Sequence, residues 1–337
     1  MLYVSTRSGD ETYTASRTLT LDYAPDGGGF LPFRMPFYSA EDLKRFQSIG
    51  FYAAVSAILG DFFRTRLSAE DMRLSFGDAL TDSRSVDRKA LLMNLWSPAS
   101  PNYNQTRYSL YCKLCRNVEP LDHTPAWVKI TIDIACIFGL YCSSEHFGKE
   151  ADFAVCSGDF SLPMAVYYCH KMGLPVGKIV CITNENGGLW DYFTHGTLSC
   201  AASAVHTCLP ALDVACPGEL ERLLQDVFGC EEAAVFADAL NKRRQYVCEL
   251  PQEITDRFHI SVAGTERIPS VILKIFKTSG YVLDPVTALC LGGLQDYRAN
   301  SGESRETILI GEDSPLCHRK LVSEALGIAE YRLSELI

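Results

Sequence analysis

The sequence predicts an α/β protein with a mostly parallel sheet and a small helical unit at its N-terminus. Two observations support this fold class. A buried run at 153–156, a helical segment at 164–172 and an apolar run at 178–183 follow one another at the spacing of a βαβ unit, which implies a parallel sheet. Apolar residues also recur at helical spacing between Phe51 and Phe63.

The composition is that of a folded, globular chain. The 337 residues can bury more than one core, and 47% of them are hydrophobic and 21% charged. A formal net charge of −10 argues against a nucleic-acid groove or an anionic membrane surface, because both require clustered lysine and arginine. We expect no signal peptide and no membrane span, and we interpret the apolar run at 132–141 as a buried helix.

Fourteen cysteines are scattered along the chain, many of them in apolar surroundings. We interpret them as reduced thiols of a cytoplasmic protein. Cys112 and Cys115 have the spacing of a metal or redox pair, but a zinc site would need a second ligand pair that the sequence does not offer. We therefore expect no metal, and a cysteine-based metal or redox module is the weakest functional alternative.

The N-terminal unit spans residues 1–80. It begins with an extended run at 2–6 and a turn at 24–29, where consecutive glycines allow positive φ angles. Ser39 and Ser68 are each followed three residues later by an aspartate. This spacing is typical of a capping box, so a helix is expected after each serine.

Residues 81–126 are expected to be mostly irregular. Ser97 to Asn102 has the composition of a loop, and only 108–115 favours a short helix. The α/β domain then covers 127–337. Beyond its βαβ unit we predict helices at 218–228 and 230–241 and strands at 270–276 and 307–310.

The loop Ser157, Gly158, Asp159, Phe160 and Ser161 lies between the first strand and the helix of the βαβ unit. A right-handed crossover places this loop at the carboxyl edge of the sheet, where α/β proteins bind ligands. Small residues at a helix N-terminus offer backbone N–H groups to an anion. A carboxylate at Asp159 would repel a phosphate, so the competing interpretation is that Asp159 caps the helix.

A second polar loop, formed by Thr183, Asn184, Glu185 and Asn186, follows the next strand at the same edge. These side chains could hold a substrate, and ordinary turn chemistry explains them equally well. The sequence contains no Gly-x-Ser-x-Gly, Walker or His-Glu-x-x-His pattern, so no nucleophile or metal motif stands out.

Several segments together resemble threonine synthase, a fold-type II pyridoxal-phosphate enzyme. Their order along the chain is the order found in that family, with Tyr3 to Arg7 similar to its Tyr-x-Ser-Thr-Arg opening and the loop from Ser157 standing at its Gly-Asn-Phe-Gly phosphate loop. The resemblance implies a fold-type II architecture. The similar segments are 3–7, 21–28, 157–161, 171–175, 183–186 and 284–288.

The resemblance also implies which residue should bind the cofactor. The family holds pyridoxal phosphate through the lysine of a Phe-His-Gly-Pro-Thr-x-x-Phe-Lys-Asp motif. Segment 95–105 stands at that place, and an ungapped alignment puts Asn104 at the lysine position. An amide cannot form a Schiff base. Lys89 and Lys113 are the nearest lysines, and we expect neither to substitute.

Further departures concern the surrounding segments. The chain passes from Pro120 almost directly to Trp127, which resembles a later Asn-Trp-Ala-Arg helix of the family. Most of the lysine-bearing subdomain is therefore expected to be missing. Asp159 and Ser161 replace the Asn and the second Gly of the phosphate loop, and Glu312 stands where the family has the Thr that bonds the ring nitrogen.

We therefore predict three parts: a threonine-synthase-like N-terminal domain at 1–80, a remnant of the lysine-bearing subdomain at 81–126, and a pyridoxal-enzyme-like α/β domain at 127–337. The face exposed by the missing subdomain is expected either to bind a partner, which includes a second copy, or to be covered by 81–122. If any cofactor binding is retained, the resemblance assigns it to residues 157–161 and Glu312.

Two functions follow from this resemblance. The first is a catalytically inactive threonine synthase homologue that binds a partner protein or a small amino-acid-like ligand, without a cofactor. The alternative is an active pyridoxal-phosphate lyase that converts O-phosphohomoserine to threonine in threonine biosynthesis. The Asn104 position favours the first function, because the alternative requires an amine that forms a Schiff base.

Overall fold

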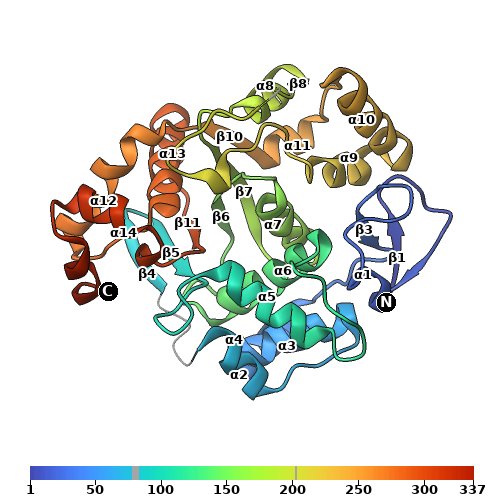
Figure 1. The fold of residues 1–337 in the computed structure, drawn as a ribbon, viewed down its shortest axis with the longest axis horizontal. Coiled ribbons are helices and arrows are strands. Elements are labelled where there is room, and N and C mark those ends of the chain that lie inside the picture. Colours follow the sequence, from blue (N-terminus) through green and yellow to red (C-terminus); the bar gives the residue numbers. More distant parts are fainter. Residues whose placement is uncertain (78–82, 202) are drawn as a thin grey trace.

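The main feature of the fold is a six-stranded sheet with helices on both faces (Figure 1). The computed structural model describes residues 1–77, 83–201 and 203–337. The strand order is β10-β7-β6-β11-β5-β4, and every neighbouring pair is parallel except β4 and β5. The strands are β4 (Ser83–Asp87), β5 (Ala90–Asn94), β6 (Ala151–Cys156), β7 (Val176–Thr183), β10 (Phe258–Val262) and β11 (Thr307–Gly311).

Alternate side chains of these strands enter two separate cores. Val155 and Ile179 pack with helices α6 and α7 on one face, whereas Ala154 and Val180 pack with α12, α13 and α14 on the other. Because both faces are covered, the inner strands are mostly apolar, as is typical of parallel sheets, with Asp152 in β6 and Lys178 in β7 as charged exceptions. The helices are α6 (Ala126–Ser143), α7 (Ser161–Lys171), α12 (Ile268–Ser279), α13 (Pro285–Ser301) and α14 (Arg319–Leu326).

The N-terminal unit contains the predicted helices and also a small antiparallel sheet. Ser39 and Ser68 form the two expected capping boxes with Asp42 and Asp71. The sheet has the strand order β2-β1-β3 and lies beside the α9–α10 pair (Figure 1). The elements are β1 (Leu2–Ser5), β2 (Tyr13–Thr14), β3 (Phe30–Pro32), α1 (Ala15–Thr18), α2 (Ala40–Ile49), α3 (Phe51–Phe63) and α4 (Ala69–Phe76).

The prediction of irregular structure before residue 126 is wrong. β5 lies inside the main sheet between β11 and β4, and α5 (Tyr103–Leu114) packs beside α4 and α6 (Figure 1). The run Ala-Leu-Leu-Met of β5 is an unbroken apolar segment, which is the pattern of a fully buried strand. β5 and α5 therefore belong to the core. The boundaries of the three predicted parts, and what covers the face left by the missing subdomain, stay predictions.

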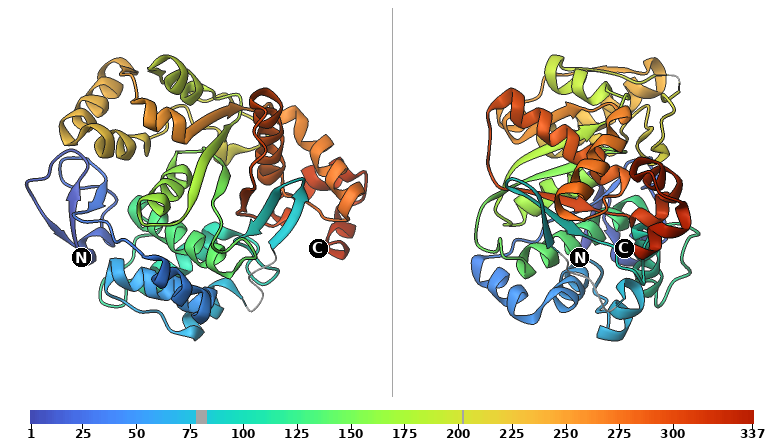
Figure 2. Two further views of the ribbon diagram at one scale, coloured as in Figure 1. Left: turned by 180° about the vertical axis from the view of Figure 1, so that it is seen from behind. Right: turned by 90° about the vertical axis from the view of Figure 1, so that its left-hand side faces the viewer.

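The strand predicted at 270–276 is also wrong, because this segment lies within α12. Its buried residues Ile268, Val271, Ile272 and Ile275 follow the three- and four-residue spacing of a helix face, and this longer pattern outweighs the local β-branched content. Views from behind and from the side show this helix at the outer edge of the molecule, beside the C-terminal segment (Figure 2).

The remaining elements surround the carboxyl edge of the sheet and the N-terminal unit. The helices predicted at 218–228 and 230–241 are confirmed as α9 and α10. The elements are α8 (Gly188–His195), β8 (Thr197–Ser199), α9 (Leu220–Phe228), α10 (Cys230–Arg243), β9 (Gln245–Val247) and α11 (Gln252–Arg257), with 3₁₀ turns at Pro210–Leu212, Thr265–Arg267, Pro315–His318 and Glu330–Glu335.

Helix α6 is long and apolar enough to cross a membrane by length and composition alone. However, 83% of its apolar window is buried inside the fold. A helix that is apolar all round is expected at the centre of a large core, so we interpret α6 as a core helix.

The cysteines correct one expectation. Cys200 and Cys216 form a disulfide, so the prediction of thiols throughout is wrong for this pair, and the other twelve cysteines are free. Cys112 lies in the last turn of α5 and Cys115 is its C-cap residue, and the helix dipole does not stabilise a thiolate at this end. Burial raises the pKa of the Cys115 thiol. Among residues 1–77, 83–201 and 203–337, no cluster of His, Cys, Asp or Glu could hold a metal ion.

Candidate functional site

A cavity of about 230 Å³ lies at the carboxyl edge of the sheet, beside the loop from Ser157 to Ser161. Strand β6 ends at this loop, and α5, α6 and the segments after β11 and β8 complete the wall. The carboxyl edge is where α/β proteins place their ligands, so this cavity is the main candidate site. Its wall consists of Asn104, Arg107, Lys129, Cys156, Ser157, Gly158, Asp159, Ser161, Leu162, Ala211, Leu212, Val214, Val286, Glu312 and Asp313.

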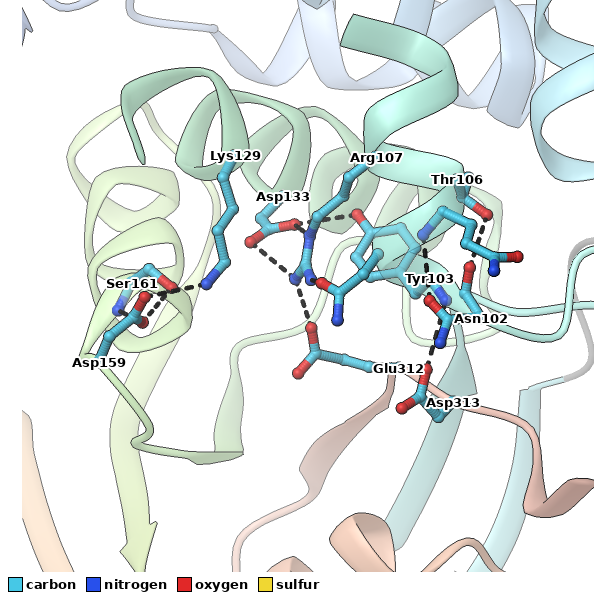
Figure 3. A network of polar contacts seen from close by, with 12 residues as sticks. Asn102, Tyr103, Thr106, Arg107, Lys129, Asp133, Asp159, Ser161, Glu312 and Asp313 are labelled. Atoms are coloured by element: carbon cyan, nitrogen blue, oxygen red, sulfur yellow. Dashed lines mark hydrogen bonds and ion pairs between the residues drawn. The ribbon is translucent and has the colours of Figure 1, made fainter. Parts of the chain in front are cut away.

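On the side of α5, the buried guanidinium of Arg107 dominates the cavity wall (Figure 3). Its Nε lies 2.8 Å from Asp133 Oδ1 and its Nη2 3.0 Å from Oδ2, so the pair is bidentate. Arg107 also forms an ion pair with Glu312. Its Nη1 donates a 2.7 Å hydrogen bond to Asn104 Oδ1, so the residue at the predicted lysine position is engaged by the arginine.

The same arginine stacks on an aromatic ring. The Arg107 guanidinium carbon lies 4.1 Å from the ring centre of Tyr103, whose hydroxyl donates a 3.0 Å hydrogen bond to Asp133. Burial lowers the pKa of Arg107, but the Asp133 and Glu312 carboxylates raise it well above its ordinary value overall. The arginine therefore carries a charge that is matched inside the fold.

On the opposite side, the side chain of Asp159 lies at the start of α7 (Figure 3). Its Oδ1 accepts a 3.0 Å hydrogen bond from the backbone N–H of Ser161, as expected of a residue that satisfies a helix start. Burial raises the pKa of Asp159, but Lys129 and the Ser161 hydrogen bonds lower it overall. A carboxylate thus stands at the helix N-terminus, where an external anion would otherwise bind.

Unlike Lys89 and Lys113, the only two considered from the sequence, a third lysine, Lys129, reaches this loop. It lies on α6, and its Nζ donates a 3.0 Å hydrogen bond to Asp159 Oδ2. The two lysines considered from the sequence lie elsewhere: Lys113 donates hydrogen bonds to Ser75 and Ser109, and Lys89 occupies the turn between β4 and β5. The packing of α6 against α7 brings Lys129 to the loop, and sequence distance does not reveal this contact.

The polar loop after β7 forms internal hydrogen bonds and does not line the cavity. Thr183 Oγ1 donates a 2.9 Å hydrogen bond to the Asn186 carbonyl oxygen, and Asn184 Nδ2 donates a 2.8 Å hydrogen bond to Asp213. Glu185 accepts hydrogen bonds from Thr265. This loop therefore supports the segment before Val214 that forms part of the cavity wall.

Most of the other predicted residues come together at the cavity. Ser157, Gly158 and Glu312 line it, whereas Phe160 is buried against Phe258, with their ring centres 5.8 Å apart. Phe160 has a φ of 75°, and this left-handed conformation turns the chain sharply into α7.

Sequence reasoning missed three central residues, Arg107, Lys129 and Asp133. One sequence signal could have identified two of them. Lys129 and Asp133 are the charged residues of α6, which is otherwise apolar, and a charge in a buried helix requires a partner. Arg107 gives no comparable signal, because α5 has no clear apolar face.

The residues present do not fit pyridoxal phosphate held as a Schiff base. At the positions that the family resemblance assigns to the cofactor, Asn104 offers no amine, Asp159 places a carboxylate in the phosphate loop, and Glu312 is paired with Arg107. Each of the three contacts expected from the family resemblance is therefore occupied by a group of this chain.

Comparison with known proteins supports the assignment of this fold. The family model "Threonine synthase N terminus" matches residues 2–79. Threonine synthase of Schizosaccharomyces pombe is 31% identical over 229 residues, which cover 60% of this chain and 44% of that protein. Threonine synthase-like 1 of Homo sapiens is 26% identical over 149 residues, which cover 42% of this chain and 20% of that protein.

The structural likeness extends over the whole chain. The crystal structure of pyridoxal-phosphate-bound threonine synthase from Brucella melitensis superposes with a TM-score of 0.80 at 17% sequence identity, covering 97% of this chain and 92% of that chain. The sequence matches span less than half the length of the curated relatives. Together, the matches and the fold support a threonine synthase-family protein with a fold-type II pyridoxal-enzyme-like architecture.

Proposed function

We propose that this chain is a catalytically inactive member of its family that serves as a scaffold or binds a ligand or partner protein without pyridoxal phosphate. The observation that carries the proposal is that protein groups fill the cofactor contacts. An ionic network of Arg107, Asp133 and Glu312 occupies one side of the cavity, and the Asp159–Lys129 pair occupies the other.

The loss of most of the lysine-bearing subdomain is part of this proposal. Among the described residues between β5 and β6, the regular elements are α5 and α6, without a strand. A cytoplasmic location also belongs to the proposal, and it is supported by twelve free cysteines among fourteen.

Lys129 is the one observation that favours the alternative, an active pyridoxal-phosphate lyase. Its amine lies at the loop where the cofactor's phosphate would bind in the family, and it lines the cavity. However, its Nζ is already engaged by the Asp159 carboxylate, so this amine takes part in an ion pair of the chain itself. When bound, pyridoxal phosphate supplies an electron sink for amino-acid chemistry.

A cofactor titration tests the proposal. The purified chain is mixed with pyridoxal phosphate, its absorbance spectrum is recorded, and the mixture is reduced with borohydride before mass spectrometry. We expect no imine band and no reduced adduct at a defined site. An adduct on Lys129 that is lost in Lys129→Ala would overturn the proposal, and an adduct that persists in Lys129→Ala indicates non-specific modification of surface lysines.

A second experiment tests the lyase directly. The chain is expressed in a cell that lacks threonine synthase and is grown without threonine. We expect no growth although the protein is folded and present, since Asn104 provides no Schiff base. Growth that depends on Lys129 would establish the active alternative.

A further inference from the structure

The cavity at the carboxyl edge carries more negative than positive charge. Four carboxylates and two cations belong to its wall or to the ion pairs directly behind it. The carboxylates therefore outnumber the cations by two, which gives these groups together a net charge of about −2. The carboxylates are those of Asp133, Asp159, Glu312 and Asp313, and the cations are Arg107 and Lys129.

Both cations are already engaged by carboxylates of the chain. Arg107 is shared by Asp133, whose side chain is fully buried, and by Glu312. Lys129 is paired with Asp159. An anionic ligand would have to separate one of these pairs. Breaking the buried Arg107–Asp133 pair is strongly unfavourable, whereas the Lys129–Asp159 pair, with side chains 28% and 46% exposed, is held less strongly.

Two carboxylates still present acceptor capacity to the cavity. Glu312 contacts Arg107 through Oε1, and its side chain remains 27% exposed, which leaves Oε2 for a ligand. Asp313 accepts a long 3.4 Å hydrogen bond from the Tyr103 backbone N–H through Oδ1. His318, 3.6 Å from Asp313 Oδ2, offsets part of this negative charge without removing the excess.

An independent observation also points to a ligand. Ser157 lines the cavity and is only 3% exposed, yet its hydroxyl has no hydrogen-bond partner in the part of the chain that the structure describes. This oxygen is not among the fully buried polar atoms that lack a partner, so it opens onto the cavity and is available to a ligand. The rest of the wall includes the apolar side chains of Leu212, Val214 and Val286.

We propose that the cavity binds a small primary amine in its ammonium form, with the short carbon chain against the apolar wall. The ammonium donates hydrogen bonds to Glu312 and Asp313, and Ser157 supplies a further acceptor. The volume of about 230 Å³ restricts the ligand to a few carbon atoms. This inference rests on the proposed function, because a resident cofactor would fill the same space.

Calorimetric titration of the full chain with three probes tests the inference. The probes are n-butylamine, 1-butanol and inorganic phosphate, all at one pH and ionic strength. We expect saturable binding of butylamine and none of the other two. Binding of butanol as tight as that of butylamine would show that charge plays no part and would overturn the proposal, as would the absence of any butylamine binding.

The variant Asp159→Asn provides the sharpest test. An asparagine oxygen can still accept the Ser161 N–H, so the helix start is retained, but Lys129 loses its counter-charge. We expect butylamine to bind at least about tenfold more weakly and phosphate binding to appear. Unchanged preferences in a folded Asp159→Asn protein would contradict the assignment.

Two further variants separate a specific site from general charge. Ser157→Ala is expected to weaken butylamine binding several-fold. Glu330→Gln removes an exposed carboxylate that does not line the cavity, and is expected to leave butylamine binding unchanged. Equal weakening by both would show a diffuse charge effect and overturn the site. Failure of the proposed function is distinguishable, because a Lys129 adduct with pyridoxal phosphate would appear whether or not butylamine binds.

Discussion

Two buried arginines, Arg222 and Arg107, lie in different regions of this molecule and have different surroundings. Arg222 lies at the junction between the N-terminal sheet and α9, where it pairs with Glu219, donates to the Phe30 carbonyl oxygen and lies over the Trp127 ring at 5.4 Å. Arg107 lies at the cavity, where it pairs with Asp133 and Glu312. Both guanidinium groups are almost inaccessible and matched by carboxylates.

The difference lies in their partners. At the junction, the partner Glu219 has a side chain only 11% exposed, and the neighbouring Glu221 joins Thr6 and Arg7, so the contacts form a closed interface. At the cavity, the partner Glu312 is 27% exposed and faces open space. A buried arginine can thus hold two parts of a fold together, or it can lie in a cavity wall while one of its partners stays accessible.

The largest expected effect comes from removing the deepest partner at the cavity. Asp133→Ala leaves Arg107 buried with one carboxylate fewer, and we expect a loss of about 3–5 kcal/mol in the free energy of unfolding. Urea denaturation measures it. As a control, Arg107→Leu with Asp133→Leu removes both charges, and its stability is expected to be much closer to that of the wild type. A loss below about 1 kcal/mol in Asp133→Ala would contradict the importance of the pair.

A second prediction concerns the pH dependence of the free energy of unfolding, which a single buried carboxyl, Asp284, is expected to affect. Asp284 caps α13, and burial raises its pKa to about 6 from the ordinary value of 3.8. A carboxyl whose folded-state pKa is raised binds its proton more tightly in the folded state, so its contribution favours folding below pH 3.8 and is lost as the pH rises through about 6.

We therefore expect Asp284→Asn, which keeps a capping oxygen, to remove this part of the pH dependence. Relative to wild type, the variant should gain stability between about pH 4 and 7, by an amount on the order of 3 kcal/mol at most. Thermal unfolding across this range, compared with wild type, measures the change. Parallel curves for the two proteins would show that Asp284 titrates normally.

At the N-terminal junction we expect a smaller effect. Glu221→Ala removes the acceptor of Arg7 and Thr6, and we expect a loss of about 2 kcal/mol, together with faster proteolysis of the first 35 residues. Glu324→Ala, an exposed carboxylate in α14, serves as the control. If both variants lose the same small amount, the junction does not depend on Glu221.

The smallest effect is local. Ser39→Ala removes the N-cap hydrogen bond of α2 without a contact to either arginine, and we expect a loss of about 1 kcal/mol. Ser48→Ala in the same helix removes a hydroxyl that donates to the Arg45 carbonyl oxygen one turn earlier, and should change stability by less than about 0.5 kcal/mol. Denaturant midpoints distinguish the two, and equal values would show that the cap contributes nothing.

Much of the fold could be predicted from local patterns. The capping boxes at Ser39 and Ser68, the βαβ unit around the loop at 157–161, and helices α9 and α10 are all found where the sequence predicts them. These elements depend on neighbours within a few residues. The strand β5 and the helix α12 were not predicted, because short apolar runs fit a strand or a helix and the core decides between them.

The sequence by itself determined the fold class, the helix starts and the absence of a lysine at position 104, because each depends on residue identity or short-range spacing. Only the tertiary structure decided the character of the cavity. It brought Arg107, Asp133 and Glu312 together across 205 residues and placed Lys129 against Asp159. The physical reason is that an unpaired charge is costly when it is buried. The packing of α5, α6 and the segment after β11 decides which charges meet, and the spacing of these residues along the chain does not reveal it.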